Sequence, residues 1–325
     1  MTVVTFREAI NRALSDAMVE DDRVFLLGED IAAAGGAFKA TDGLLETFGK
    51  NRVRDTPISE QAIIGTAMGA ALKGLRPVAE LMFADFAGVA FDQIANQLSK
   101  YRYMTGGQGG VPATIRMANG AGGGFGAQHS QTVENWFLNV PGLKIAVPGS
   151  PQDAYDLLRA AVRDPDPVLF FEHKLMMNAK GELSDHSDPV ELGQAVVVRE
   201  GSDVTVVATQ LMRLRAEQAA DTLAQQGISV ELIDPRTLAP LDLETIGASV
   251  DKTGRLLVVQ EAPFSGSWGA TVVAALMRDR FESFDVPPAI LSGDATPVPY
   301  SGGLEDVWLI TPERIVAGVQ AVKDS

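Results

Sequence analysis

Short apolar runs rich in Val, Ile, Leu and Phe alternate along this chain with segments whose apolar residues recur at helical spacing. This alternation is typical of a mostly parallel β-sheet, because a helix carries the chain back to the start of each new strand and covers a face of the sheet. We therefore predict an α/β fold with helices on both faces of the sheet. The predicted strands are 24–27, 78–82, 113–117, 143–147, 168–171, 194–198, 204–208, 230–233 and 256–259. The predicted helices are 6–18, 61–72, 86–103, 153–162, 211–225 and 270–277, with a last helix beginning at Thr311 and Pro312.

Two helix starts have clear sequence signals. Thr5 followed by Glu8 forms the pattern of a capping box, in which each side chain binds the backbone of the other residue. Ser150, Pro151 and Asp153 place a cap, a first-turn proline and an early acid before an apolar run. We expect helices to begin at both places.

The strand and helix pattern lapses into a polar segment at residues 174–192 and then resumes. A chain of 325 residues is longer than one typical domain of about 100–200 residues. We therefore predict a first domain over residues 1–180 and a smaller α/β domain over residues 190–325.

The net charge of the chain limits the classes of partner that it can bind. With 27 basic and 42 acidic residues, the net charge is −15, which opposes binding to nucleic acid or to anionic lipid and suits a basic protein partner. The apolar run at residues 62–72 is too short to span a membrane. The first ten residues lack the layout of a signal peptide and the chain has no cysteine, so we expect the cytosol and no disulfide.

Glu60, in the segment DTPISEQ, is the first candidate for chemistry because it stands where a loop passes into an apolar helix. A carboxylate there can exchange a proton with a ligand. The alternative is a structural glutamate that the helix dipole favours, with Ser59 as the helix cap. Periodicity alone favours the structural alternative.

His129, in the segment NGAGGGFGAQHSQ, is the second candidate. Glycines allow backbone angles and close approaches that other residues resist, and imidazole exchanges protons near neutral pH. The alternative is a tight connection with a structural histidine. The segment matches neither dinucleotide- nor P-loop fingerprints, and His129, His173 and His186 are spaced too irregularly for zinc, so we predict no zinc site.

Seven segments in one order resemble the beta subunits of the decarboxylating component of thiamine-diphosphate-dependent 2-oxoacid dehydrogenases, of pyruvate or acetoin type. The resemblance covers nearly the whole chain and implies a pyrimidine-binding domain of transketolase type followed by a transketolase-C-terminal-like domain. The segments are DTPISEQ, GLRPVAELMFADF, DQIANQLSKYRYMTGG, NGAGGGFGAQHSQ, PGLKIAVPGSPQDA, RDPDPVLFFEH and PRTLAPLD.

The resemblance implies roles for single residues. Glu60 matches the glutamate that binds the aminopyrimidine ring nitrogen and promotes the tautomer that deprotonates the thiazolium carbon. Phe86 matches the aromatic residue against that ring, although helix core is the default reading of the aromatic residues around it. Ile58 and Met82 match neighbouring wall positions. His129 matches the active-site histidine, which manages protons or orients the lipoyl group during acyl transfer.

The resemblance also implies partners. The family's alpha subunit holds the diphosphate through Mg²⁺ and a GDG motif, and this chain contains no GDG. We therefore expect a heterotetramer of two alpha and two beta subunits that shares thiamine diphosphate between them. The acidic segment 292–297 resembles a region that binds the basic subunit-binding domain of a lipoyl acyltransferase core. Some relatives bind K⁺, and the matching positions are Ala113, Ala161, Val162, Asp164 and Asp166, where Asp166 departs from a commoner Asn.

The resemblance thus implies an oxidoreductase subunit that acts on an oxo group and uses a lipoyl disulfide as acceptor. Pyruvate, branched-chain 2-oxoacids and acetoin all remain open as substrates, because the alpha subunit builds part of the pocket. A free-standing transketolase is disfavoured by the length of the chain and the missing GDG. A noncatalytic paralogue that serves as a scaffold is the alternative, and the presence of both Glu60 and His129 disfavours it.

Overall fold

The computed structural model describes residues 1–184 and 190–325, which form two compact units. The first unit comprises Met1–Asn119 and Trp136–Leu192. The second comprises Gly120–Asn135 and Gly193–Ser325. The glycine-rich segment therefore groups with the second half of the chain, although it lies within the first predicted domain in sequence.

The first unit is built on a parallel sheet whose strand order is β6-β7-β5-β4-β2-β3. Strands β2, β5 and β7 are buried along their whole length, as expected for a sheet with both faces covered. This confirms the predicted mostly parallel architecture. The strands are β2 (Val24–Gly28), β3 (Val53–Asp55), β4 (Arg76–Leu81), β5 (Thr114–Asn119), β6 (Lys144–Ala146) and β7 (Val168–His173).

Both predicted helix starts in this unit are confirmed. Helix α1 (Phe6–Glu20) begins with the complete capping box of Thr5 and Glu8. Helix α6 (Pro151–Arg163) begins after Ser150, whose hydroxyl accepts a hydrogen bond from the backbone N–H of Asp153. The remaining helices of this unit include α2 (Leu44–Phe48), α3 (Glu60–Leu72) and the short η3 (Lys174–Met176).

The predicted helix over residues 86–103 is wrong as a single element. The chain there forms a 3-10 helix, η1 (Ala84–Gly88), a π-helical stretch, η2 (Gln93–Leu98), and a short α-helix, α4 (Tyr101–Met104). Apolar residues near helical spacing recur in all three, so the sequence pattern does not reveal the changes of helix type. Tyr103 is 89% exposed, so it is not helix core.

The polar stretch after β7 contains an unexpected strand, β8 (Lys180–Leu183), which pairs antiparallel with β1 (Thr2–Thr5). Its burial pattern is mostly exposed, which explains why no apolar alternation marks it.

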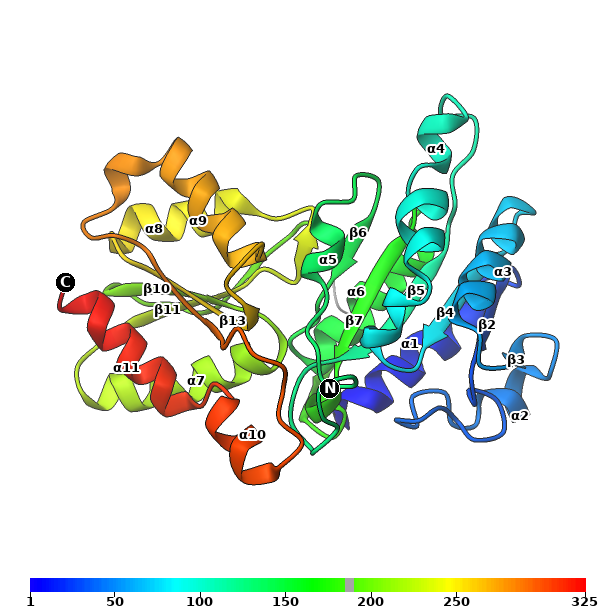
Figure 1. Ribbon diagram of the computed structural model, residues 1–325, viewed down its shortest axis with the longest axis horizontal. Coiled ribbons are helices and arrows are strands. Elements are labelled where there is room, and N and C mark those ends of the chain that lie inside the picture. The colour runs from blue at the N-terminus through cyan, green and yellow to red at the C-terminus, as the bar shows by residue number, and fades with distance from the viewer. Residues whose placement is uncertain (185–189) are drawn as a thin grey trace. The chain divides into compact units, whose positions relative to one another are not determined.

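The second unit contains a sheet of order β14-β13-β10-β11-β9, parallel except for β9. Helices α7 and α11 cover one face, and α8 and α9 cover the other (Figure 1). Its strands are β9 (Val196–Arg199), β10 (Val204–Ala208), β11 (Val230–Asp234), β13 (Leu256–Pro263) and β14 (Ala289–Gly293). Its helices include α7 (Gln210–Gln225), α8 (Leu243–Thr253), α9 (Trp268–Asp279), α10 (Gly302–Trp308) and α11 (Pro312–Lys323).

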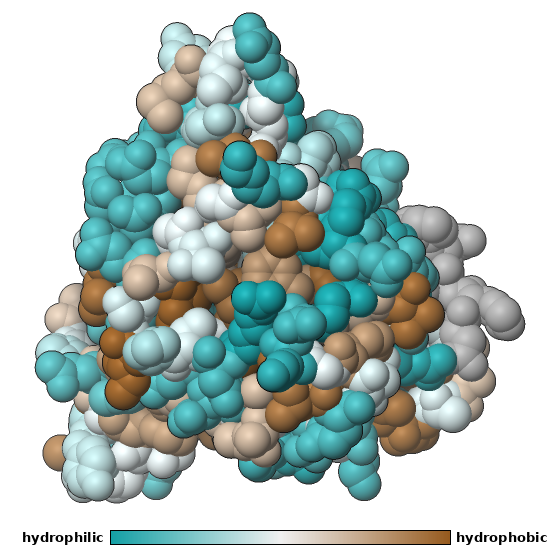
Figure 2. Space-filling view, turned by 90° about the vertical axis from the view of Figure 1, so that its right-hand side faces the viewer, coloured by the Kyte–Doolittle hydropathy of each residue, from teal (hydrophilic) through white to brown (hydrophobic). Residues whose placement is uncertain are grey.

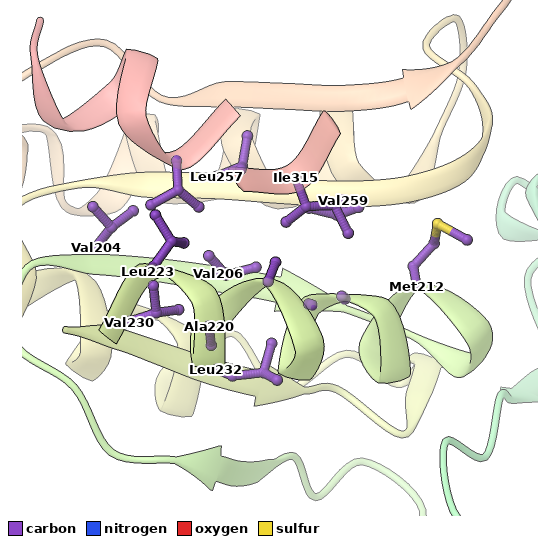
Figure 3. Close-up of a cluster of buried hydrophobic side chains, with 14 of the residues drawn as sticks. Val204, Val206, Met212, Ala220, Leu223, Val230, Leu232, Leu257, Val259 and Ile315 are labelled. Carbon is purple, nitrogen blue, oxygen red and sulfur yellow. The ribbon is translucent and has the colours of Figure 1, made fainter. Parts of the chain in front are cut away.

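The core of the second unit lies between its sheet and the helices α7 and α11. Val206, Leu232 and Val259 from the strands meet Leu223 and Ile315 from the helices (Figure 3). All are at most 1% exposed, so this layer supplies much of the hydrophobic stabilisation of the unit.

Short elements complete the chain: α5 (Asn135–Leu138), β12 (Thr237–Ala239) and η4 (Phe281–Ser283). No described helix is both long and apolar enough to cross a bilayer.

Candidate active site

Glu60 is the first residue of α3 and is only 9% exposed. Ser59 occupies the predicted cap position, but its side chain makes no capping hydrogen bond. The positive end of the helix dipole favours a carboxylate at this position. Within the described residues we find no hydrogen bond to the Glu60 side chain. A buried carboxylate of this kind is available to a polar group of a ligand.

The other predicted cofactor-binding residues follow the carboxyl ends of strands in the same sheet. Ile58 and Glu60 come after β3, and Met82 and Phe86 come after β4. Strands β3, β2 and β4 are neighbours and run parallel, so the segments after them leave the sheet at one edge. This is the edge at which open α/β sheets bind ligands.

Glu29 is a candidate that sequence reasoning missed. It follows β2, the strand between β3 and β4, and is partly buried. Burial raises the pKa of the Glu29 carboxyl, and the charges of Asp30 and Glu60 raise it further. The charge of Glu60 therefore acts on Glu29. The available sequence signal was the position of Glu29 directly after a fully apolar strand.

Three phenylalanines pack against one another in the segments that follow β2 and β4. Phe86 lies in η1, and its ring packs edge-on against Phe83 with centroids 5.7 Å apart. Phe83 in turn packs edge-on against Phe38 at 5.9 Å. Ile58 is 75% exposed, which is unusual for a large apolar side chain beside a buried acid. The edge therefore combines the buried carboxylate of Glu60 with apolar and aromatic side chains.

His129 belongs to the second unit, whereas Glu60, Met82 and Phe86 belong to the first. The backbone N–H of His129 donates to the carbonyl of Gly126 at 3.4 Å, and its side chain is half-buried. Gly122 and Gly124 have φ angles of 103° and 75°, which other residues rarely adopt. The expected unusual backbone of this segment is confirmed.

The groups predicted to hold K⁺ lie directly before β5, in the last turn of α6, and in the turn between α6 and β7. The carbonyls of Val162 and Asp164 both accept from one nitrogen of Arg76, at 2.8 and 3.1 Å, so these two oxygens are close together. The Asp164 carboxylate pairs with Lys144 and accepts from the backbone N–H of Asp166 at 2.9 Å. A carbonyl oxygen has a second lone pair, so the Val162 and Asp164 carbonyls keep acceptor capacity, but the cations Arg76, Lys144 and Arg102 already contact the predicted positions. The five predicted positions are Ala113, Ala161, Val162, Asp164 and Asp166.

Among the described residues, no group of three or more His, Asp or Glu side chains is arranged to hold a metal ion. His173 ends β7, and its Nδ1 accepts from the backbone N–H of Leu175 at 3.2 Å. His186 lies outside the described residues.

Comparisons with known proteins agree with these features. Residues 2–180 match the pyrimidine-binding domain of transketolase, and residues 193–315 match the C-terminal domain of transketolase. The chain is 46% identical to the beta subunit of acetoin:2,6-dichlorophenolindophenol oxidoreductase from Bacillus subtilis, over 97% of this chain and 96% of that protein. It is 41% identical to the beta subunit of the pyruvate dehydrogenase E1 component from Rickettsia bellii, over 98% of both chains.

Two further relatives extend the comparison. The beta subunit of 3-methyl-2-oxobutanoate dehydrogenase from Mycobacterium tuberculosis is 43% identical, over 98% of this chain and 92% of that protein. A split-gene transketolase, solved as an inactive tetramer of beta chains, superposes with a TM-score of 0.81 at 25% identity, over 99% of this chain and 98% of that one. The chain thus belongs to the family of beta subunits of the decarboxylating component of thiamine-diphosphate-dependent 2-oxoacid and acetoin dehydrogenases.

Proposed function

We propose that this chain, together with an alpha subunit, decarboxylates a 2-oxoacid or cleaves acetoin and passes the acyl group to a lipoyl arm. The observation that carries the proposal is Glu60, a buried carboxylate with no hydrogen bond among the described residues, at the ligand-binding edge of a pyrimidine-binding domain. The three relatives named above act on acetoin, pyruvate and 3-methyl-2-oxobutanoate by their names. Their identities to this chain, 41–46%, do not separate these substrates.

Each residue of the site has a definite task in this proposal. Glu60 binds the pyrimidine ring nitrogen and holds the proton there. Phe86, Met82 and Ile58 form the walls that orient the ring and exclude water. His129 holds or moves a proton during acyl transfer to the lipoyl group. When bound, thiamine diphosphate supplies the carbon nucleophile and the electron sink that amino acid side chains lack.

The rest of the cofactor site comes from the partner. All three relatives are named as beta subunits, and the chain has no GDG motif, so the alpha subunit supplies the diphosphate and Mg²⁺ site. We expect two alpha and two beta chains. Apolar side chains are interspersed among polar ones on the face of the molecule in Figure 2. Tyr103, Met104 and Val89 of the first unit are between 60% and 89% exposed, and these are suitable contacts for another subunit.

The acyltransferase core is the second proposed partner. Residues 294–297, in the predicted segment 292–297, are exposed and follow β14. Asp294 gives the segment its negative charge, and the whole chain carries a net charge of −15. Both favour association with a basic subunit-binding domain.

Replacement of Glu60 tests the proposal. Glu60→Gln keeps the size of the side chain but removes the carboxylate, so the assembled complex should lose about 10²–10⁴-fold in turnover. Glu46→Gln is the matched control, because Glu46 is exposed and also lies in the first turn of a helix of the first unit. The measurement is turnover of the purified alpha–beta complex, with assembly checked by gel filtration. Wild-type turnover in Glu60→Gln would refute the catalytic role and favour the scaffold.

A further inference from the structure

Two buried carboxylates of the second unit hold the glycine-rich segment that carries His129. Glu305 in α10 is 4% exposed, and its two oxygens accept from the backbone N–H groups of Gly122 and Gly124, both at 2.9 Å. One side chain thus binds the segment twice, five and seven residues before His129. Backbone N–H groups that converge in this way form a concave site for an anion. Here the anion is the carboxylate of Glu305 from the same chain.

Glu261 in β13 holds the segment on both sides of His129. One of its carboxylate oxygens accepts from the backbone N–H of Ala121 at 2.6 Å and from the hydroxyl of Thr132 at 3.0 Å. Glu261 is 5% exposed. A single buried oxygen therefore connects the start of the segment to a residue three positions after His129.

The end of the segment is also attached to the second unit. The side-chain carbonyl of Asn135 accepts from the backbone N–H of Trp268, the first residue of α9, at 3.0 Å. Glu261 and Glu305 thus hold the segment near its beginning and at Thr132, and Asn135 attaches its end to Trp268. This explains why Gly120–Asn135 groups with the second unit.

Packing alone cannot fix the centre of the segment. Residues 122–124 are glycines without side chains, and Phe125 is 40% exposed. Hydrogen bonds from buried backbone N–H groups to carboxylates are about twice as strong as neutral ones, and the loss of either partner leaves a buried polar group unpaired. The two glutamates therefore determine the path of this backbone.

We infer that Glu305 and Glu261 are positioning residues that set the place of the His129 imidazole for acyl transfer. The inference rests on the role proposed above for His129. Both glutamates accept hydrogen bonds from backbone N–H groups of the segment, so their effect on His129 passes through the backbone. A displacement of about 1 Å at a catalytic group costs up to about 100-fold in rate, so a loosened segment affects the step that uses His129 more than the steps that precede it.

Glu305→Gln in the assembled alpha–beta complex tests the inference. The amide keeps the shape but replaces one acceptor oxygen with a donor that faces a backbone N–H. We expect acyl transfer to an isolated lipoyl domain to fall by about 10–100-fold, while dye-linked turnover, which bypasses the lipoyl group, changes by less than about threefold. Asp306→Asn, on the neighbouring exposed residue of α10, should leave both rates unchanged. Equal loss of both rates in Glu305→Gln would overturn the inference.

A double substitution separates this inference from the function on which it rests. If Glu305 acts through His129, adding Glu305→Gln to His129→Ala should cause no further loss of acyl transfer. Additive losses would overturn the inference. If His129→Ala itself leaves acyl transfer intact, the proposed role of His129 fails instead. Should Glu305→Gln not fold, Thr132→Val removes only the hydroxyl that binds Glu261, and it should lower the same rate severalfold with dye-linked turnover preserved; loss of neither rate would count against the inference.

Discussion

At the scale of single residues, the proposed contact between Phe86 and the cofactor can be tested directly. Its ring is already held edge-on by Phe83, so it can meet a second ring without reorganisation. Loss of the ring in Phe86→Ala should raise the concentration of thiamine diphosphate needed for half-maximal activation by about tenfold, which corresponds to about 1.4 kcal/mol. The measurement is cofactor titration of the alpha–beta complex.

Phe281→Ala is the control for that prediction, because Phe281 is an exposed phenylalanine of the second unit, at 65%. It should leave the titration unchanged. An unchanged titration in Phe86→Ala would show that the ring does not contact the cofactor.

Some residues of the site could be predicted from sequence and others could not. Glu60 stands where a loop passes into an apolar helix, and Phe86 lies four residues after the apolar run 78–82. The carboxyl ends of parallel strands, near which both lie, are where ligands bind. Glu261 and Glu305 bind Ala121 and Gly122, which are 140 and 183 positions away in the chain. Local pattern carries no information on pairs of that separation, so the network that holds His129 emerges only from the fold.

At the scale of elements, an ionic group joins three neighbouring strands of the first sheet. Arg116 of β5 donates two hydrogen bonds to Glu172 of β7, at 2.7 and 2.9 Å, and one to Glu80 of β4, at 2.7 Å. Burial alone would lower the pKa of Arg116, but the charges of Glu172 and Glu80 outweigh it and raise the pKa. The guanidinium therefore stays charged in the core.

Arg116→Met should destabilise the chain by about 3–5 kcal/mol, because it leaves the buried carboxylate of Glu172 and the partly buried one of Glu80 without their cation. Arg163→Met is the control: the Arg163–Glu20 pair is about half exposed, so its loss should cost less than about 1 kcal/mol. Thermal melting of both variants checks the difference. Equal melting temperatures would show that the buried group contributes no more than a surface pair. Addition of Glu172→Gln to Arg116→Met should recover part of the loss.

Potassium is predicted to stabilise the turn between α6 and β7. Binding of K⁺ by the carbonyls of Val162 and Asp164 would neutralise crowded oxygen dipoles beside the carboxylate of Asp164. At ten times its dissociation constant, the ion should raise the melting temperature by about 3–6 °C. The measurement compares KCl with NaCl at equal ionic strength. Identical melting temperatures in KCl and NaCl would show that K⁺ does not stabilise this chain.

Elements with strong apolar periodicity could be predicted from sequence, and those without it could not. The β10 strand and helix α7 lie within one residue of the predicted ranges, because their apolar residues face a single core. The segment from η1 to α4 keeps a similar apolar content while its helix type changes twice. Helix type there depends on tertiary packing, which overrides the local pattern.

At the scale of the whole molecule, the two units divide the proposed chemistry. The first carries Glu60 and the aromatic walls, and the second carries His129 on a segment that its own carboxylates hold. Two-domain organisation follows from the length of the chain and the repeated α/β pattern. The membership of Gly120–Asn135 in the second unit cannot be predicted in this way, because it depends on contacts between residues far apart in the chain.

We propose that this chain holds only part of a thiamine diphosphate site and works as a pair with an alpha subunit. The most direct measurement is thiamine-diphosphate-dependent dye reduction by the co-expressed alpha–beta pair and by the beta chain alone, with pyruvate, 3-methyl-2-oxobutanoate and acetoin. We predict turnover in the pair with at least one of these substrates and none in the beta chain alone; turnover by the beta chain alone would contradict the account.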